Sequence, residues 1–73
     1  MLANWNQYFV IRRETGRTFR AVKLLVETTD GLKEAWFPRS VISLHRYQDA
    51  DGSWTWQVGV PNWLSKKIGI AEY

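Results

Sequence analysis

The chain contains no cysteine, one histidine and two prolines among its 73 residues. Without cysteine, neither a disulfide framework nor a thiolate metal site can stabilise the fold. His45 is the sole imidazole, so a zinc site has almost no nitrogen ligands to draw on. We therefore expect no metal and no other cofactor.

The sequence also lacks a long hydrophobic run. No apolar stretch approaches the ~20 residues of a membrane-spanning helix, and the N-terminus has no hydrophobic segment typical of a signal peptide. These absences predict a soluble, cytoplasmic protein that does not interact with membranes. A chain of this length is expected to form one domain, 1–73, around one small core.

Aromatic residues and positive charge, by contrast, are abundant. Five tryptophans, three tyrosines and three phenylalanines are too many for so small a core, so some rings should lie on the surface and be available for binding. The net charge is +3, and residues 1–26 hold five basic residues against Glu14 alone. A basic N-terminal hairpin favours an anionic partner.

Alternation of apolar and polar residues predicts five strands between residues 8 and 60, after an irregular lead-in at 1–7. The expected strands are 8–13, 17–28, 32–37, 41–48 and 53–60. The clearest alternation is in the last strand, where one face holds Trp54, Trp56, Val58 and Val60. This strand is expected to be half-buried.

The first hairpin is predicted to turn through Glu14-Thr15-Gly16, because glycine accepts the positive φ of a three-residue loop. This register pairs Ile11 with Phe19 and Phe9 with Ala21, which places all four apolar side chains on one face. The apolar face then changes along the second strand, which predicts a bulge near residues 21–23.

The second hairpin turns at Asp30-Gly31, but its register stays open. A two-residue loop places Glu27 opposite Glu34, whereas a three-residue loop places Glu27 opposite Lys33. Because a slip of one residue inverts every side chain, the face that Trp36 occupies also stays open.

Pro38 should end the third strand, since proline has no backbone N–H to donate to a sheet. The chain is then expected to turn through Pro38-Arg39-Ser40. Residues 62–69 are predicted to form a short helix, with Asn62 as its N-cap and Gly69 where it stops. Together these elements predict an all-β fold, a small five-stranded SH3-like or OB-like barrel with a short C-terminal helix.

Two constellations that resemble active or metal sites have simpler explanations. No sequence motif joins His45 to any of the serines, so we expect no catalysis. Asp49-Ala50-Asp51-Gly52-Ser53 has acidic residues near a glycine, but its spacing does not match a calcium-binding loop, and a turn is the better interpretation.

The basic hairpin and the excess of rings favour a non-enzymatic protein that binds single-stranded DNA or RNA, because such sites combine stacking with phosphate contacts. The candidate binding residues are Tyr8, Arg12, Arg13, Arg17, Arg20, Lys23, Trp36, Arg39 and Arg46. The alternative is a protein–protein interaction module that uses a strand edge or a tryptophan-bearing patch.

Two segments carry a resemblance to a known group. They are Trp36-Phe37-Pro38-Arg39-Ser40-Val41-Ile42 and Val60-Pro61-Asn62-Trp63-Leu64, the latter followed by two lysines and Gly69. This layout, over residues 21–69, resembles small uncharacterised proteins of phages and other mobile elements. The resemblance implies the small β fold and a phage setting but no particular function. The alternative function, a phage-type interaction module, also includes an inhibitor of a host protein.

Overall fold

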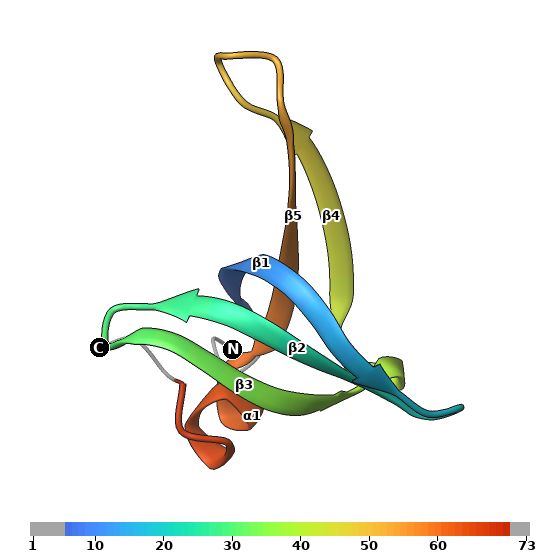
Figure 1. Ribbon diagram of the computed structural model, residues 1–73. Coiled ribbons are helices and arrows are strands. Elements are labelled where there is room, and N and C mark those ends of the chain that lie inside the picture. Colours follow the sequence, from blue (N-terminus) through green and yellow to red (C-terminus); the bar gives the residue numbers. More distant parts are fainter. Residues whose placement is uncertain (1–5, 71–73) are drawn as a thin grey trace.

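The structure, a computed structural model, describes residues 6–70 (Figure 1). It contains the elements β1 (Asn6–Arg17), β2 (Ala21–Thr28), β3 (Gly31–Pro38), the 3-10 helix η1 (Arg39–Val41), β4 (Ser43–Gln48), β5 (Trp54–Pro61) and α1 (Asn62–Lys67). The predicted all-β class with a short C-terminal helix is confirmed. The predicted lead-in is wrong for residues 6 and 7, which belong to β1, and its first five residues lie outside the described part.

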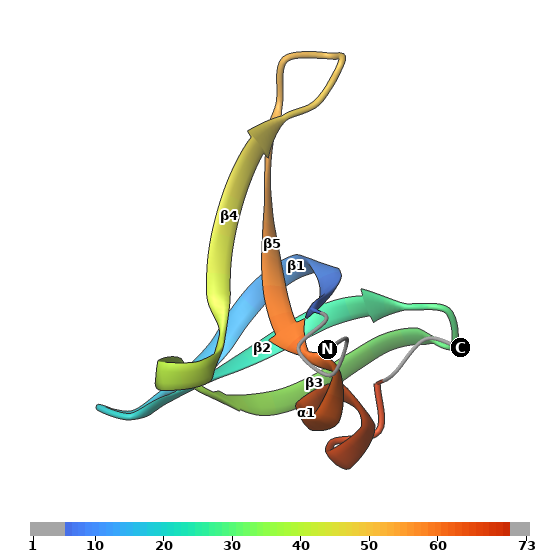
Figure 2. The same cartoon turned by 180° about the vertical axis from the view of Figure 1, so that it is seen from behind.

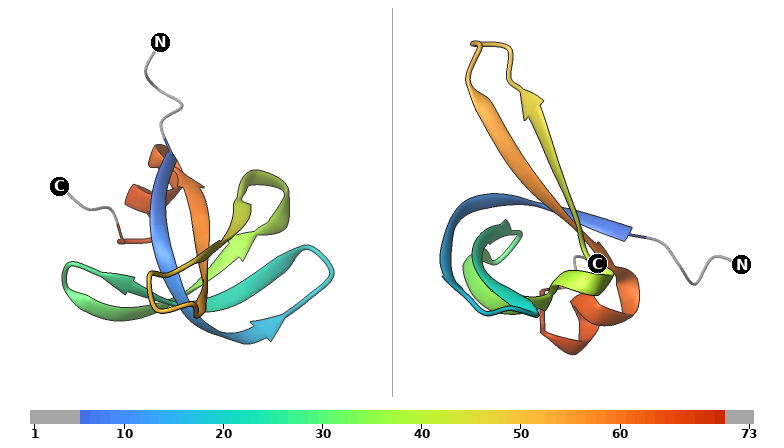
Figure 3. Two further views of the ribbon diagram at one scale, coloured as in Figure 1. Left: turned by 90° about the horizontal axis from the view of Figure 1, so that it is seen from above. Right: turned by 90° about the vertical axis from the view of Figure 1, so that its right-hand side faces the viewer.

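All five strands belong to one antiparallel sheet with the order β3-β2-β1-β5-β4. The sheet rolls up but does not close into the predicted barrel, because β3 and β4 are its two edges and no ladder joins them among the described residues (Figure 3). The chain crosses from one edge to the other through η1, where Pro38 ends β3 as predicted.

The first hairpin differs from the prediction. β1 continues through the expected turn to Arg17, and the chain turns instead at residues 18–20. The Thr18 N–H donates to the carbonyl of Ala21 at 2.8 Å, and the Ala21 N–H donates to the Thr18 hydroxyl at 3.1 Å. Phe19 therefore lies in the loop, with 92% of its surface exposed, rather than beside Ile11.

The predicted bulge is also misplaced. Val22, Leu24 and Val26 are all buried, so β2 keeps one inward face along its whole length. The register shifts lie in β1, between Ile11 and Arg13 and between Glu14 and Gly16. The apparent change of face came from counting Phe19 as part of the strand.

The second hairpin takes neither of the two registers weighed from the sequence. Thr28 pairs with Gly31, which places Leu32 opposite Glu27 and Trp36 opposite Lys23. Gly31 adopts a φ of +105° at the turn. Phe37 therefore points into the core and Trp36 points out.

The core lies inside the roll and is closed from below by the C-terminal segment (Figure 2). Its buried hydrophobic side chains are Phe9, Val22, Leu24, Val26, Phe37, Val58, Val60, Leu64 and Ile70. Asn62 is the first residue of α1 and not its N-cap, and its Oδ1 accepts a hydrogen bond from Gln7 Nε2.

Gly69 terminates the C-terminal helix as predicted, although α1 itself ends at Lys67 and not at residue 69. Gly69, with a φ of +82°, donates its N–H to the carbonyl of Lys66, and Ile70 donates to that of Ser65. This pair of bonds is the Schellman arrangement that terminates helices. Within the described range, no helix is long and apolar enough to cross a membrane.

β4 and β5 leave the roll together as a two-stranded arm (Figures 1 and 3). β1 pairs with β5 only from Pro61 to Trp56, so the part of β5 before Trp56 has β4 as its sole strand partner among the described residues. We call residues 43–59 the arm, and only its outer part, residues 47–55, is two-stranded, because residues 56–59 also pair with β1.

Candidate functional site

The inward face of the sheet continues out of the roll onto the arm. Val58 is buried beside Phe9, but the next inward residues along β5, Trp56 and Trp54, are exposed. Their partners on β4 are Arg46 and Gln48, and Leu44 pairs with Val58. We define the arm face as four of the exposed side chains that follow the core, namely Leu44, Arg46, Trp54 and Trp56.

Arg46 organises the arm face. Its guanidinium lies 4.5 Å from the ring centroid of Trp54 and 5.8 Å from that of Trp56. These are cation–π distances, which hold the long arginine side chain over two indole rings. Among the described residues, Arg46 makes no ion pair. The arm thus presents two aromatic rings and an unneutralised positive charge to solvent.

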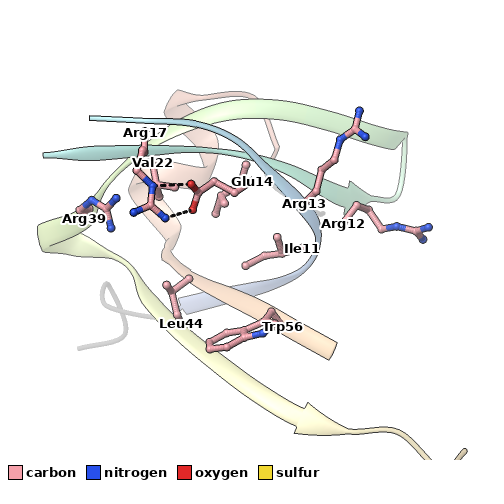
Figure 4. Close-up of a pocket in the computed structure, with 10 residues that line it drawn as sticks. Ile11, Arg12, Arg13, Glu14, Arg17, Val22, Arg39, Leu44 and Trp56 are labelled. Atoms are coloured by element: carbon pink, nitrogen blue, oxygen red, sulfur yellow. Dashed lines mark hydrogen bonds and ion pairs between the residues drawn. The ribbon is translucent and has the colours of Figure 1, made fainter. Parts of the chain in front are cut away.

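A cleft of about 460 Å³ opens where the arm leaves the roll (Figure 4). It lies between β1 and the arm, and Ile11 and Leu44 point into it (Figure 4). Its lining residues are Ile11, Arg12, Arg13, Glu14, Arg17, Val22, Leu24, Arg39, Leu44 and Trp56. Trp56 therefore belongs both to the arm face and to the cleft.

One end of the cleft is positively charged. Arg17 donates two hydrogen bonds to the carboxylate of Glu14, at 2.7 and 3.0 Å. The bond from Arg17 lowers the pKa of Glu14, and Arg39 adds to that effect, so the carboxylate stays ionised. Arg17 and Arg39 carry two positive charges against the one negative charge of Glu14, so this end of the cleft keeps a net positive charge.

Three of the predicted binding residues, Arg17, Arg39 and Arg46, lie along this cleft and arm. Arg12 and Arg13 border the cleft, but their guanidinium groups point away from it (Figure 4). Arg12 forms an ion pair with Glu27. The fold therefore divides the predicted basic hairpin between two faces.

The two aromatic residues among the predicted binding residues, Trp36 and Tyr8, lie on the outer face of the sheet. Trp36 stands over Gly16, with the Lys23 ammonium 5.8 Å from its ring centroid, and Lys23 is also 3.4 Å from Glu34. Tyr8 lies beside Gly59 on the outer side of β5. The predicted residues thus do not form one surface. Arg20 does not line the cleft but adjoins it at the tip of the first hairpin, where its carbonyl accepts a hydrogen bond from the Arg39 N–H.

Sequence reasoning missed Trp54, Trp56, Leu44 and Phe19 as candidate binding residues. The alternation in β5 correctly put both tryptophans on the face of Val58, but alternation does not show where a core ends. The length of the chain could have indicated this, because the core of a 73-residue protein is too small to cover the inward face of every strand.

The outer side of the arm brings Ser43 and His45 together, with Oγ and Nε2 3.0 Å apart. The Tyr8 ring packs edge-on against His45. Within residues 6–70, no carboxylate contacts His45 and no cluster of metal-ligating side chains occurs. The described residues therefore do not form a hydrolase triad, which needs an acid to orient the imidazole.

Comparison of the chain with protein-family models, with curated proteins and with solved structures finds no match. The resemblance to small phage proteins thus stays a prediction.

Proposed function

We propose that the protein binds single-stranded nucleic acid and catalyses no reaction on it. The observation that carries this proposal is the arm face, where Arg46 lies over Trp54 and Trp56 next to a cleft with Arg17 and Arg39 at its far end. Exposed indoles stack on nucleobases, and each stacked base contributes about 1–3 kcal/mol. Arginines beside them neutralise the phosphates.

A single strand fits this surface better than a duplex. The faces of duplex bases are already stacked on one another, so they are not available to the indoles of the arm. The surface consists of a cleft and a protruding ribbon (Figure 3), and the rings of Trp54 and Trp56 lie on one side of that ribbon. Among the described residues, it has no helix shaped to enter a groove of a duplex. The protein is therefore expected to prefer single strands of DNA or RNA to the matching duplex.

Binding of fluorescently labelled oligonucleotides, followed by anisotropy, tests this proposal. The protein should bind single strands more tightly than duplexes, and the affinity should fall between about 50 and about 200 mM salt as counterions are released. Absence of binding to any single strand at the lower salt concentration would overturn the proposal.

A pair of tryptophan variants locates the site. Trp56 and Trp36 are each 45% exposed, but Trp56 lies on the arm face and Trp36 on the outer face. Loss of one stacked base weakens binding about 5- to 150-fold, so Trp56→Ala should have this effect while Trp36→Ala leaves affinity unchanged. Equal losses in the two variants would contradict the assignment of the site to the arm.

The second candidate function is a protein–protein interaction module, in the phage setting an inhibitor of a host protein. It is favoured by the edge of β4, which has no strand partner on the side away from β5 among the described residues. Such an edge can accept a strand from another protein. A protein partner captured through this edge should stay bound at high salt, whereas a nucleic acid should dissociate.

A further inference from the structure

The tip of the first hairpin carries the most exposed large hydrophobic side chain of the described residues. Phe19 is 92% exposed, and the hydrogen bonds between Thr18 and Ala21 fix the turn that holds it. The ring is not part of the core or of the partly buried shell around it. It therefore contributes little to folding and is available to a ligand.

Positive charge surrounds this ring. Two shallow hollows flank it, one lined by Arg17, Thr18 and Arg39 and the other by Arg20, Arg39 and Ser40. Arg39 is held against the tip, because its backbone N–H donates to the carbonyl of Arg20 at 2.9 Å. Neither Arg20 nor Arg39 forms an ion pair with any of the described residues.

The tip is continuous with the cleft. Arg17 and Arg39 line the cleft and also a hollow beside Phe19. A ligand that starts on the arm can therefore pass Trp56 and the cleft, meet these two guanidinium groups, and reach the ring of Phe19. Aromatic rings lie at both ends of this path and arginines lie between them.

We infer that Phe19 is a second stacking position for the strand that binds the arm, with Arg17 and Arg39 contacting the phosphates between the two ends and Arg20 contacting those beside Phe19. This inference rests on the proposed function. A strand too short to span the path can occupy only one end. A longer strand stacks at both ends and gains affinity until its length matches the path.

The experiment measures affinity against oligonucleotide length, from about 4 to about 16 nucleotides, the range of site sizes that single OB-fold domains cover. In the wild-type protein, affinity should rise with length to a plateau. Phe19→Leu removes the ring but keeps an apolar side chain, so its plateau should come at a shorter length and at an affinity about 5- to 150-fold lower. Phe19→Trp keeps an aromatic ring at this position, so its affinity should depend on length as that of the wild-type protein does.

The control is Leu32→Ala, which removes another exposed apolar side chain from the second hairpin and should leave the curve unchanged. A wild-type curve for Phe19→Leu would overturn the inference but leave the proposed function intact, whereas no binding by the wild-type protein would overturn the proposed function. If the wild-type protein instead bound phosphatidylserine vesicles through Phe19, with oligonucleotide binding unaffected in Phe19→Leu, the tip would be a lipid contact and the inference would be wrong.

Discussion

Gly59 shows how a single residue lets three strands pack side by side. It pairs with Tyr8 on β1 and with Ser43 on β4. A Cβ at this position would lie 2.6 Å from Ser43 Oγ and 2.8 Å from Tyr8 Cε1, closer than real contacts allow. The missing side chain makes room for the Tyr8 ring where the arm joins the roll.

Gly59→Ala should therefore destabilise the protein by about 1–3 kcal/mol, the usual cost of overpacking. The matched control is Gly16→Ala, whose new Cβ would meet its nearest atoms, on Lys23 and Trp36, at an ordinary 3.5 Å. Urea denaturation of both variants measures the difference. Identical midpoints for Gly59→Ala and the wild-type protein would show that Tyr8 and Ser43 move aside freely.

At the scale of the element, the arm is the least supported part of the sheet. Between Trp56 and the turn, β5 pairs with β4 alone. A two-stranded ribbon of this kind is only marginally stable in water when it is isolated. The turn of the arm is closed by backbone bonds from the Asp49 N–H to the Ser53 carbonyl and from the Gly52 N–H to the Asp49 carbonyl. Side chains add to these, since Asp49 accepts hydrogen bonds from the hydroxyls of Ser53 and Thr55, and Asp51 accepts one from the Ser53 N–H. Gly52, with a φ of +90°, completes the turn.

Gly52→Ala should loosen the arm without loosening the core. The new Cβ meets no atom within 4 Å, so the cost is the backbone strain of an L-residue at positive φ, about 1–2 kcal/mol. Amide hydrogen exchange should accelerate in residues 46–56 and stay unchanged at Phe9 and Val26. Gly31→Ala, which introduces the same strain into the other turn, should leave exchange in the arm unchanged.

The sequence predicted the elements better than their pairing. Pro38 and Gly69 marked the ends of β3 and α1 correctly, because each imposes a local backbone restriction that needs no partner. The turn of the first hairpin was misplaced, because Thr15-Gly16 is a good local turn signal, whereas burial of Val22, Leu24 and Val26 together stabilises a different register. Non-local packing decided that choice.

The same limit applied to the candidate site. Arg17, Arg39 and Arg46 were predicted from charge alone, and they do lie along the cleft and arm. Which of their neighbours face the same way depends on the two register shifts in β1, and no local residue pattern revealed those shifts. The tryptophans of the arm were missed because the core ends before the strand does.

At the scale of the whole molecule, three carboxylates make stability depend on pH. Hydrogen bonds lower the pKa of Glu14 through Arg17, of Glu34 through the Thr15 hydroxyl, and of Asp51 through the Ser53 N–H. Each carboxylate therefore stays ionised to a lower pH in the folded protein than in the unfolded chain. Its contribution to stability is present above its ordinary pKa, about 4 for Asp and Glu.

The unfolding temperature should accordingly fall as the pH is lowered from about 5 to about 3, because the unfolded chain takes up protons first. The effect should shrink in about 1 M salt, since all three groups are on the surface. Glu14→Gln should make the dependence on pH shallower. Thermal unfolding followed by circular dichroism measures these changes, and an unfolding temperature that rises over this interval would contradict the assignment.

The positions of the tryptophans also determine what the intrinsic fluorescence of this protein measures. Four of the five indoles, those of Trp36, Trp54, Trp56 and Trp63, are between 45% and 56% exposed in the folded chain. Because about half of each of these indoles is already exposed, unfolding should shift their emission less than it would shift that of fully buried indoles. An iodide or acrylamide quencher should reach the arm readily and lose access when a ligand covers it. Quencher access to Trp54 and Trp56 therefore reports occupancy of the arm more directly than it reports folding.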